Sequence, residues 1–109
     1  MNATLAALAE PNRLRIVEYL REGPRSVNEI VGKLQLPQPL VSKHLRVLKT
    51  AGLVEVHPDA QRRLYRLQAV RFKELDRWLG TFRRLWEDRL DTLEDYLKEA
   101  NRIQTRTSN

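Results

Sequence analysis

The chain has 109 residues, which suits one small domain, and its 20 Lys and Arg against 14 Asp and Glu give a net charge of +6. A basic excess of this size suggests a polyanionic partner. The absence of cysteine excludes disulfides, thiolate metal sites and thiol redox sensing, and no apolar run approaches the roughly 18 residues that a membrane span needs.

The first stretch, MNATLAALAEPNRLR, lacks the charged leader and long apolar run of a signal peptide, so a cytoplasmic protein is expected. Residues 4–9 are apolar and alanine-rich and predict a short helix. Pro11 then fits the first turn of a second helix, because the N–H that proline lacks is not needed there. Apolar residues recur at three-residue spacing from Leu14 to Leu20, which predicts an amphipathic helix that ends before the EGP breaker at 22–24.

Two short helices are predicted next. Ser26 and Glu29 have the spacing of a capping box, which predicts the start of a helix over residues 26–34. A second helix over 39–50 begins with a proline in its first turn and ends before a glycine. Two short helices separated by a tight turn are typical of a helix-turn-helix.

The period then changes. The runs LVEVH (53–57) and RRLYRL (62–67) are β-prone and are joined by PDAQ, an arrangement that predicts a β-hairpin. A helix-turn-helix followed by a hairpin is the order of elements in a winged helix-turn-helix.

From about residue 69 the helical period returns and continues for some thirty residues. Apolar residues seven apart form a seam: Phe72, Leu79, Trp86, Leu93 and Ala100, with Leu75, Phe82, Tyr96 and Ile103 three residues further along. Arg89 interrupts the second series. A heptad seam of this length predicts a partner helix, and the polar tail 101–109 is expected to fray.

The basic excess is not spread evenly. Residues 1–50 carry eight Lys or Arg and four Asp or Glu, residues 51–68 carry three and two, and residues 69–109 carry nine and eight. The positive charge therefore lies mostly on the helix-turn-helix, as it does in DNA-binding domains.

The predicted helix 39–50 has two different faces. Val41, Leu45 and Leu48 have the spacing of a core face, whereas polar and cationic residues occupy another face. In a helix-turn-helix the second helix enters the major groove, where such side chains reach base edges and phosphates. The candidate DNA-binding residues are Gln38, Pro39, Ser42, Lys43, His44, Arg46 and Lys49, together with Arg62 and Arg63 on the hairpin.

Three of these assignments have alternatives. His44 could instead pack locally as a partly buried histidine. Arg62 and Arg63 could lie along the DNA backbone or in the minor groove, or could be a charged edge that discourages sheet aggregation.

Three segments carry a resemblance to a known family. LAEPNRLRIVEYL, QPLVSKHLRVLKTAGLVEV and RRLYRL resemble the opening helix, recognition helix and wing of the ArsR family of bacterial winged-helix regulators. The resemblance covers roughly residues 5–98 and implies a homodimer, in most members a repressor, whose first and last helices form the interface. It places Gln38, Ser42, Lys43, His44 and Arg46 on the DNA-contacting helix and Arg62 and Arg63 on the wing. Together with the seam, it makes these residues the dimer-interface candidates: Leu5, Leu8, Leu79, Phe82, Trp86 and Leu93.

The chain also departs from the family pattern. Many members sense metals through cysteines or through a histidine and carboxylate set on the last helix, but this chain has no cysteine and its last helix has no histidine. The carboxylates on that helix lie near cations and suit ordinary ion pairs; they are Asp88, Asp91, Glu94 and Asp95. No metal or other cofactor is therefore expected. Ala60 and Gln61 stand at the wing tip, where the family often has Gly-Arg.

The expected fold is mainly α with a small β-hairpin: one winged helix-turn-helix domain over 1–109, with a DNA-binding core at 10–68 and dimerisation helices at 1–9 and 69–100. The expected function is a homodimeric repressor that blocks a promoter by binding double-stranded DNA at a near-palindromic operator. The alternative is a protein-interaction module with incidental DNA binding. An enzyme is not expected, because the sequence has no nucleophile–base pair, phosphate loop or metal-ligand set. A small-molecule or protein effector is not identified.

Overall fold

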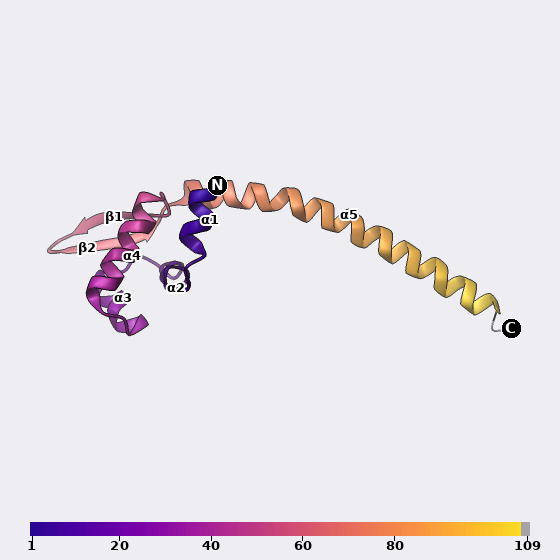
Figure 1. The fold of residues 1–109 in the computed structure, drawn as a ribbon, viewed down its shortest axis with the longest axis horizontal. Coiled ribbons are helices and arrows are strands. Elements are labelled where there is room, and N and C mark those ends of the chain that lie inside the picture. The colour runs from indigo at the N-terminus through magenta and orange to yellow at the C-terminus, as the bar shows by residue number, and fades with distance from the viewer. Residues whose placement is uncertain (108–109) are drawn as a thin grey trace. The chain divides into compact units, whose positions relative to one another are not determined.

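The computed structural model describes residues 1–107, and Figure 1 shows its elements in chain order. They are α1 (Asn2–Leu8), α2 (Pro11–Leu20), α3 (Val27–Leu34), α4 (Gln38–Thr50), β1 (Val54–Asp59), β2 (Arg62–Leu67) and α5 (Ala69–Thr107). The predicted winged helix-turn-helix with a long last helix is confirmed. The chain forms two compact units, residues 1–75 and 76–109. The interpretation of the whole chain as one domain stays a prediction.

The first unit has a continuous apolar core. Its largest fully buried side chains come from α2, α3, α4 and the segment after α4: Ile16, Ile30, Val41, Leu45, Leu48 and Leu53. Phe72, in the first turn of α5, packs against this core. The spacing that predicted the core face of α4 is therefore confirmed. In α2, Val17 and Leu20 are buried, but Leu14, which belongs to the same spacing series, is 45% exposed.

A guanidinium group fastens α1 to the start of α2. The backbone N–H of Arg13 donates to the carboxylate of Glu10, the N-cap of α2, at 2.8 Å. The Arg13 side chain donates to the carbonyls of Ala7 at 2.7 Å and Ala6 at 3.3 Å. A cation at the end of α1 also interacts favourably with the helix dipole.

The helix-turn-helix has the predicted signals at its boundaries. The Ser26 hydroxyl accepts from the Glu29 N–H at 3.2 Å, and the Glu29 carboxylate accepts from the Ser26 N–H at 3.1 Å. Gly52 ends α4 with a φ of 77°, a left-handed conformation that glycine adopts without steric cost. A Cβ at this position would also lie 3.3 Å from the Arg71 side chain.

The hairpin is longer than predicted. β1 pairs with β2 in antiparallel register from Val54 opposite Leu67 to Asp59 opposite Arg62, so Ala60 and Gln61 alone form the loop. The predicted four-residue connection PDAQ was wrong, because Pro58 and Asp59 continue the strand. Proline is tolerated there since both strands of a two-stranded sheet are edges.

The last helix is also longer than predicted. Residues 101–107 continue α5 beyond the predicted end of the dimerisation helix at residue 100, whereas the fraying of the tail stays a prediction; residues 108–109 lie outside the described part. An ion pair at helical spacing, Arg102 to Glu99 at 2.6 Å, stabilises these last turns.

Candidate nucleic-acid interface

The two faces of α4 are separated as predicted. Val41, Leu45 and Leu48 are buried in the core. The remaining candidates on α4, other than His44, are exposed or partly exposed: Gln38, Pro39, Ser42, Lys43, Arg46 and Lys49. The core therefore fixes the helix while its cationic face stays open to solvent.

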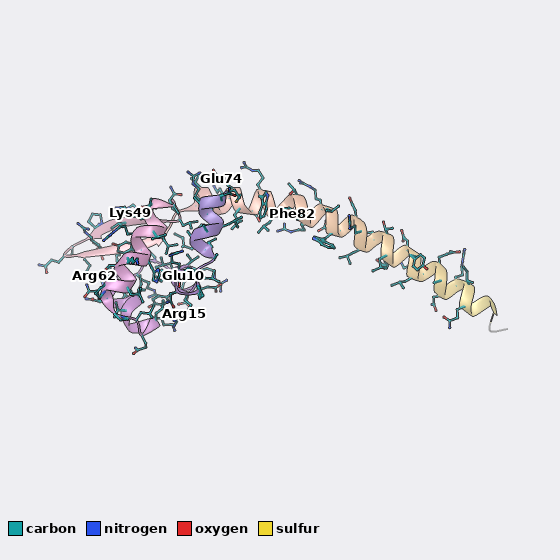
Figure 2. The ribbon with its side chains drawn as sticks, viewed as in Figure 1. Glu10, Arg15, Lys49, Arg62, Glu74 and Phe82 are labelled. Atoms are coloured by element: carbon teal, nitrogen blue, oxygen red, sulfur yellow. The ribbon has the colours of Figure 1, made fainter. Side chains whose placement is uncertain are left out.

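A hollow of about 270 Å³ lies between α4 and the hairpin. Three of the cations predicted from sequence meet there: Arg46 and Lys49 from α4 and Arg63 from β2. Ser42, Leu45 and Tyr65 complete the lining, so the hollow contains no carboxylate. Figure 2 shows Lys49 on α4 and Arg62 on the hairpin.

A second hollow, of about 230 Å³, joins the first turn of α3, the start of α4 and the wing tip. Gln38, Arg62 and Arg63 line it, together with Asn28 and Gln61, which the sequence analysis missed. Both missed residues are exposed and polar. Asn28 could have been found from its position in the first turn of the helix-turn-helix, where backbone N–H groups are free to meet a phosphate.

The two wing arginines differ in their partners. Arg62 forms ion pairs with Asp59 at 3.2 Å and with Glu29 at 3.8 Å. The Ser26 backbone N–H, and to a smaller extent Arg25 and Arg62, hold the pKa of Glu29 below its ordinary value. The Arg63 side chain has no intramolecular hydrogen bond or ion pair in the described part of the chain. Arg63 is therefore the freer of the two cations.

A charged cluster braces the hairpin across its strands. Arg66 donates to Glu55 at 2.7 Å, and these two residues are register partners. His57 lies 3.2 Å from the same carboxylate. The hydrogen bond from Arg66, and next the nearby His57 ring, lower the pKa of Glu55. Arg25 also forms a bridge to Tyr65, which ties β2 to the segment before α3.

His44 takes the packing position that the sequence left open. It is only 7% exposed, and its Nε2 lies 3.7 Å from the Glu10 carboxylate at the start of α2. Its Nδ1 is buried without a hydrogen-bond partner. His44 therefore seats α4 against α2, and its side chain is buried whereas the neighbouring candidates on α4 are exposed or partly exposed.

The candidate interface residues at the two ends of the chain are largely exposed. Leu5, Leu79, Phe82, Trp86 and Leu93 are each at least 37% exposed. Leu8 differs because it packs partly against the core. Further large apolar side chains on α5 extend the exposed surface: Trp78, Leu85, Leu90, Tyr96, Leu97 and Ile103. An apolar stripe of this length is unusual for a helix that has no partner.

The described residues also bear on metal binding and membrane insertion. Within residues 1–107 there is no cluster of three or more His, Asp or Glu side chains arranged to hold a metal ion. None of the described helices combines the length and apolar character needed to span a bilayer.

The known proteins that this chain resembles are transcriptional regulators, which fits a cationic surface on a helix-turn-helix. Residues 10–56 match the sequence family described as bacterial regulatory protein, arsR family. The chain is 52% identical over 63 residues to the HTH-type transcriptional repressor SmtB of Mycobacterium tuberculosis, a match that covers 58% of this chain and 47% of the repressor. It is 37% identical over 70 residues to an HTH-type transcriptional regulator of Methanocaldococcus jannaschii, with 63% of this chain and 79% of that protein covered.

A solved structure has the same fold. The homodimeric winged helix-turn-helix DNA-binding domain of Mb0332 from Mycobacterium bovis aligns with a TM-score of 0.62 at 27% identity, over 79% of this chain and 77% of that one. The match to SmtB spans about half of that relative's length. The family match over residues 10–56 covers the helix-turn-helix.

Proposed function

Because the chain belongs to the ArsR family of bacterial regulatory proteins, we propose that it is a homodimeric, sequence-specific DNA-binding repressor of transcription. The single observation that carries this proposal is the cationic face of α4, which forms no ion pair within the described residues, is mounted on a buried apolar face and is flanked by the hairpin. Nothing in the relatives supports the alternative of a protein-interaction module. Acting on a bacterial operator, the protein would work in the cytoplasm.

In the proposed complex α4 lies in the major groove. Gln38, Ser42 and Arg46 have the hydrogen-bonding groups to read base edges, and Lys43 and Lys49 can neutralise phosphates. Arg63 extends the cationic surface onto the wing. His44 contributes indirectly, by holding α4 in position through Glu10.

Dimer formation is proposed through the apolar stripe of α5. Residues 76–86 carry three basic and one acidic side chain, whereas residues 87–104 carry three basic and six acidic ones. An antiparallel pair that crosses near Trp86 would set the basic segment of each copy against the acidic segment of the other. A parallel pair would instead bring like charges together, so the charge pattern favours the antiparallel arrangement.

Two recognition helices related by a two-fold axis suit a near-palindromic operator with half-sites one turn, ~34 Å, apart. Repression would follow from occlusion of the promoter. If the dimer neutralises roughly six to ten phosphates, its affinity should fall by about 10³ to 10⁵ between about 50 and 200 mM salt.

The test begins with footprinting on the DNA upstream of the protein's own gene, which locates an operator. Ser42→Ala and Arg46→Ala should each weaken binding to that operator in gel-shift titrations, with a loss of about 1–3 kcal/mol where a base contact is removed. Circular dichroism should show that both variants stay folded, because both side chains lie outside the core.

Arg21→Ala is the matched control for Arg46→Ala, since it removes the same charge from an exposed position at the end of α2. It should leave operator affinity close to that of the unmodified protein. Unchanged affinity in both α4 variants, or equal losses in all three, would refute the assignment of α4 as the recognition helix.

A further inference from the structure

A third hollow lies away from the wing, between α1 and the second half of α4. Its volume is about 390 Å³, within the range of small-molecule sites. Its walls are mostly small apolar groups, among them Ala6 and Ala7 of α1 and Val47 and Ala51 around the end of α4. The hydroxyl of Thr50 is the one neutral polar side-chain group among the lining residues.

Two guanidinium groups line this hollow, and no carboxylate does. Arg13 donates to the carbonyls of Ala6 and Ala7 and forms no ion pair in the described residues. Arg46 has neither a hydrogen bond nor an ion pair with its side chain in that part of the chain. Two positive charges beside an apolar wall, neither of them in an ion pair within the described residues, complement a ligand that is negative at one end and apolar at the other.

We propose that this hollow is a binding site for a small organic carboxylate with an apolar body, and that such a ligand is the effector of the proposed repressor. The carboxylate would pair with the Arg46 guanidinium in the bidentate geometry that arginine offers, with Thr50 as a further donor. The apolar body would lie against the alanine and valine side chains. The statement that the ligand is an effector rests on the function proposed above. The statement that the hollow binds such a ligand does not.

The position of Arg46 explains how binding would release DNA. Arg46 lines both this hollow and the hollow between α4 and the hairpin. A guanidinium that turns into this hollow to pair with a carboxylate turns away from the hollow beside the hairpin, and the bound carboxylate cancels the positive charge that Arg46 offers to DNA. A ligand that pairs with Arg46 therefore lowers operator affinity without any movement of α4.

Binding is tested on the full chain labelled with ¹⁵N, with phenylacetate as the probe. Phenylacetate should produce saturable shifts in the backbone amides of Ala6, Val47 and Thr50. Two matched compounds separate the parts of the ligand, because 2-phenylethanol lacks the charge and acetate lacks the apolar body. Both should bind at least about tenfold more weakly, the factor that loss of one charged hydrogen bond or of the apolar contact gives.

A pair of variants at one position tests the location. Thr50→Glu places a carboxylate one helical turn from Arg46 and should abolish phenylacetate binding. Thr50→Gln has nearly the same size without the charge and should keep most of it. Arg46→Gln should weaken binding about tenfold, because a charge-assisted pair is lost.

Several outcomes overturn the site: no saturable shift, equal effects of acetate or inorganic phosphate, or equal binding by the two Thr50 variants. If a second copy of the chain closed the hollow, phenylacetate would cause no saturable shift. In gel shifts, phenylacetate should raise the apparent Kd of the unmodified protein for its operator but not that of Thr50→Glu. If the protein binds its operator but not phenylacetate, only the proposed ligand site is refuted. If it binds phenylacetate but no DNA, only the proposed function is refuted.

Discussion

At the scale of single residues, the wing tip carries a local conflict between sequence and backbone. Ala60 is the first of the two loop residues and has a φ of 54°, whereas Gln61 does not have a positive φ. This pattern is that of a type II′ hairpin turn, which prefers glycine at its first central position. A left-handed conformation costs an L-residue with a Cβ roughly 1–2 kcal/mol. The backbone conformation of Ala60 in this loop therefore lowers the stability of the folded protein.

Ala60→Gly should accordingly stabilise the protein, by up to about 1 kcal/mol after the entropy cost of glycine in the unfolded chain. Urea unfolding measures the change, and hydrogen exchange of the hairpin amides shows whether it is local. Gln61→Gly is the control, because no positive φ is relieved there, and it should be neutral or destabilising. A lower stability for Ala60→Gly would contradict the II′ assignment.

At the scale of an element, α3 depends on the reciprocal hydrogen bonds between Ser26 and Glu29. The Glu29 carboxylate also lies 3.6 Å from Arg25 and 3.8 Å from Arg62 of the wing. The cap of α3 therefore links the helix-turn-helix to the hairpin. This arrangement favours the charged carboxylate, and the pKa of Glu29 is lowered on folding, first by the Ser26 backbone N–H.

The sign of the resulting pH dependence follows from linkage. A lowered pKa means that the folded state binds this proton less readily than the unfolded state. The contribution of Glu29 is therefore complete above the ordinary glutamate pKa and is lost as the pH falls through the lowered value.

Glu29→Gln, which keeps the capping geometry, should lose less stability than the unmodified protein when the pH falls from neutral to about 3. Urea unfolding at several pH values checks this. Glu55, whose pKa is lowered by Arg66 and His57, should account for part of the loss that remains, so the double variant with Glu55→Gln should lose still less. Identical acid sensitivity in the unmodified protein and Glu29→Gln would show that the cap carries no such contribution.

At the scale of the whole molecule, the apolar stripe of α5 is exposed in the single chain. Trp78 and Phe82 pack edge to face within the stripe, with ring centroids 5.0 Å apart, and both remain more than a third exposed. Arg89 interrupts the stripe and has no intramolecular partner in the described residues. An acidic side chain of a second copy would satisfy this charge.

Trp86→Glu should convert the proposed dimer into monomers in sedimentation experiments, because it places a carboxylate at the centre of the apolar interface. Trp86 is 58% exposed in the single chain, so the variant should still fold. Thr81→Glu adds the same charge outside the stripe and should remain dimeric. A dimer that persists in Trp86→Glu would mean that the subunits associate elsewhere. Weakened operator binding by the monomer would connect the stripe to the proposed function.

The sequence by itself determined the elements and most of the candidate interface. Helix boundaries were predictable because the capping box at Ser26, the proline of α4 and the stop at Gly52 act through neighbours only a few residues away. The two faces of α4 were predictable because a helix repeats regularly. The hairpin strands were predicted too short, because proline and aspartate are rare in strands, yet Pro58 and Asp59 pair with Arg63 and Arg62.

Only the tertiary structure decided features that join residues distant in the chain. It buried His44 against Glu10, paired Arg62 with Glu29, and brought Arg13 and Arg46 to one hollow beside α1. Spacing along a helix says which side chains share a face, but it does not say which other element covers that face. These contacts depend on how the helices pack, and packing is set by the summed burial of the core rather than by any local pattern.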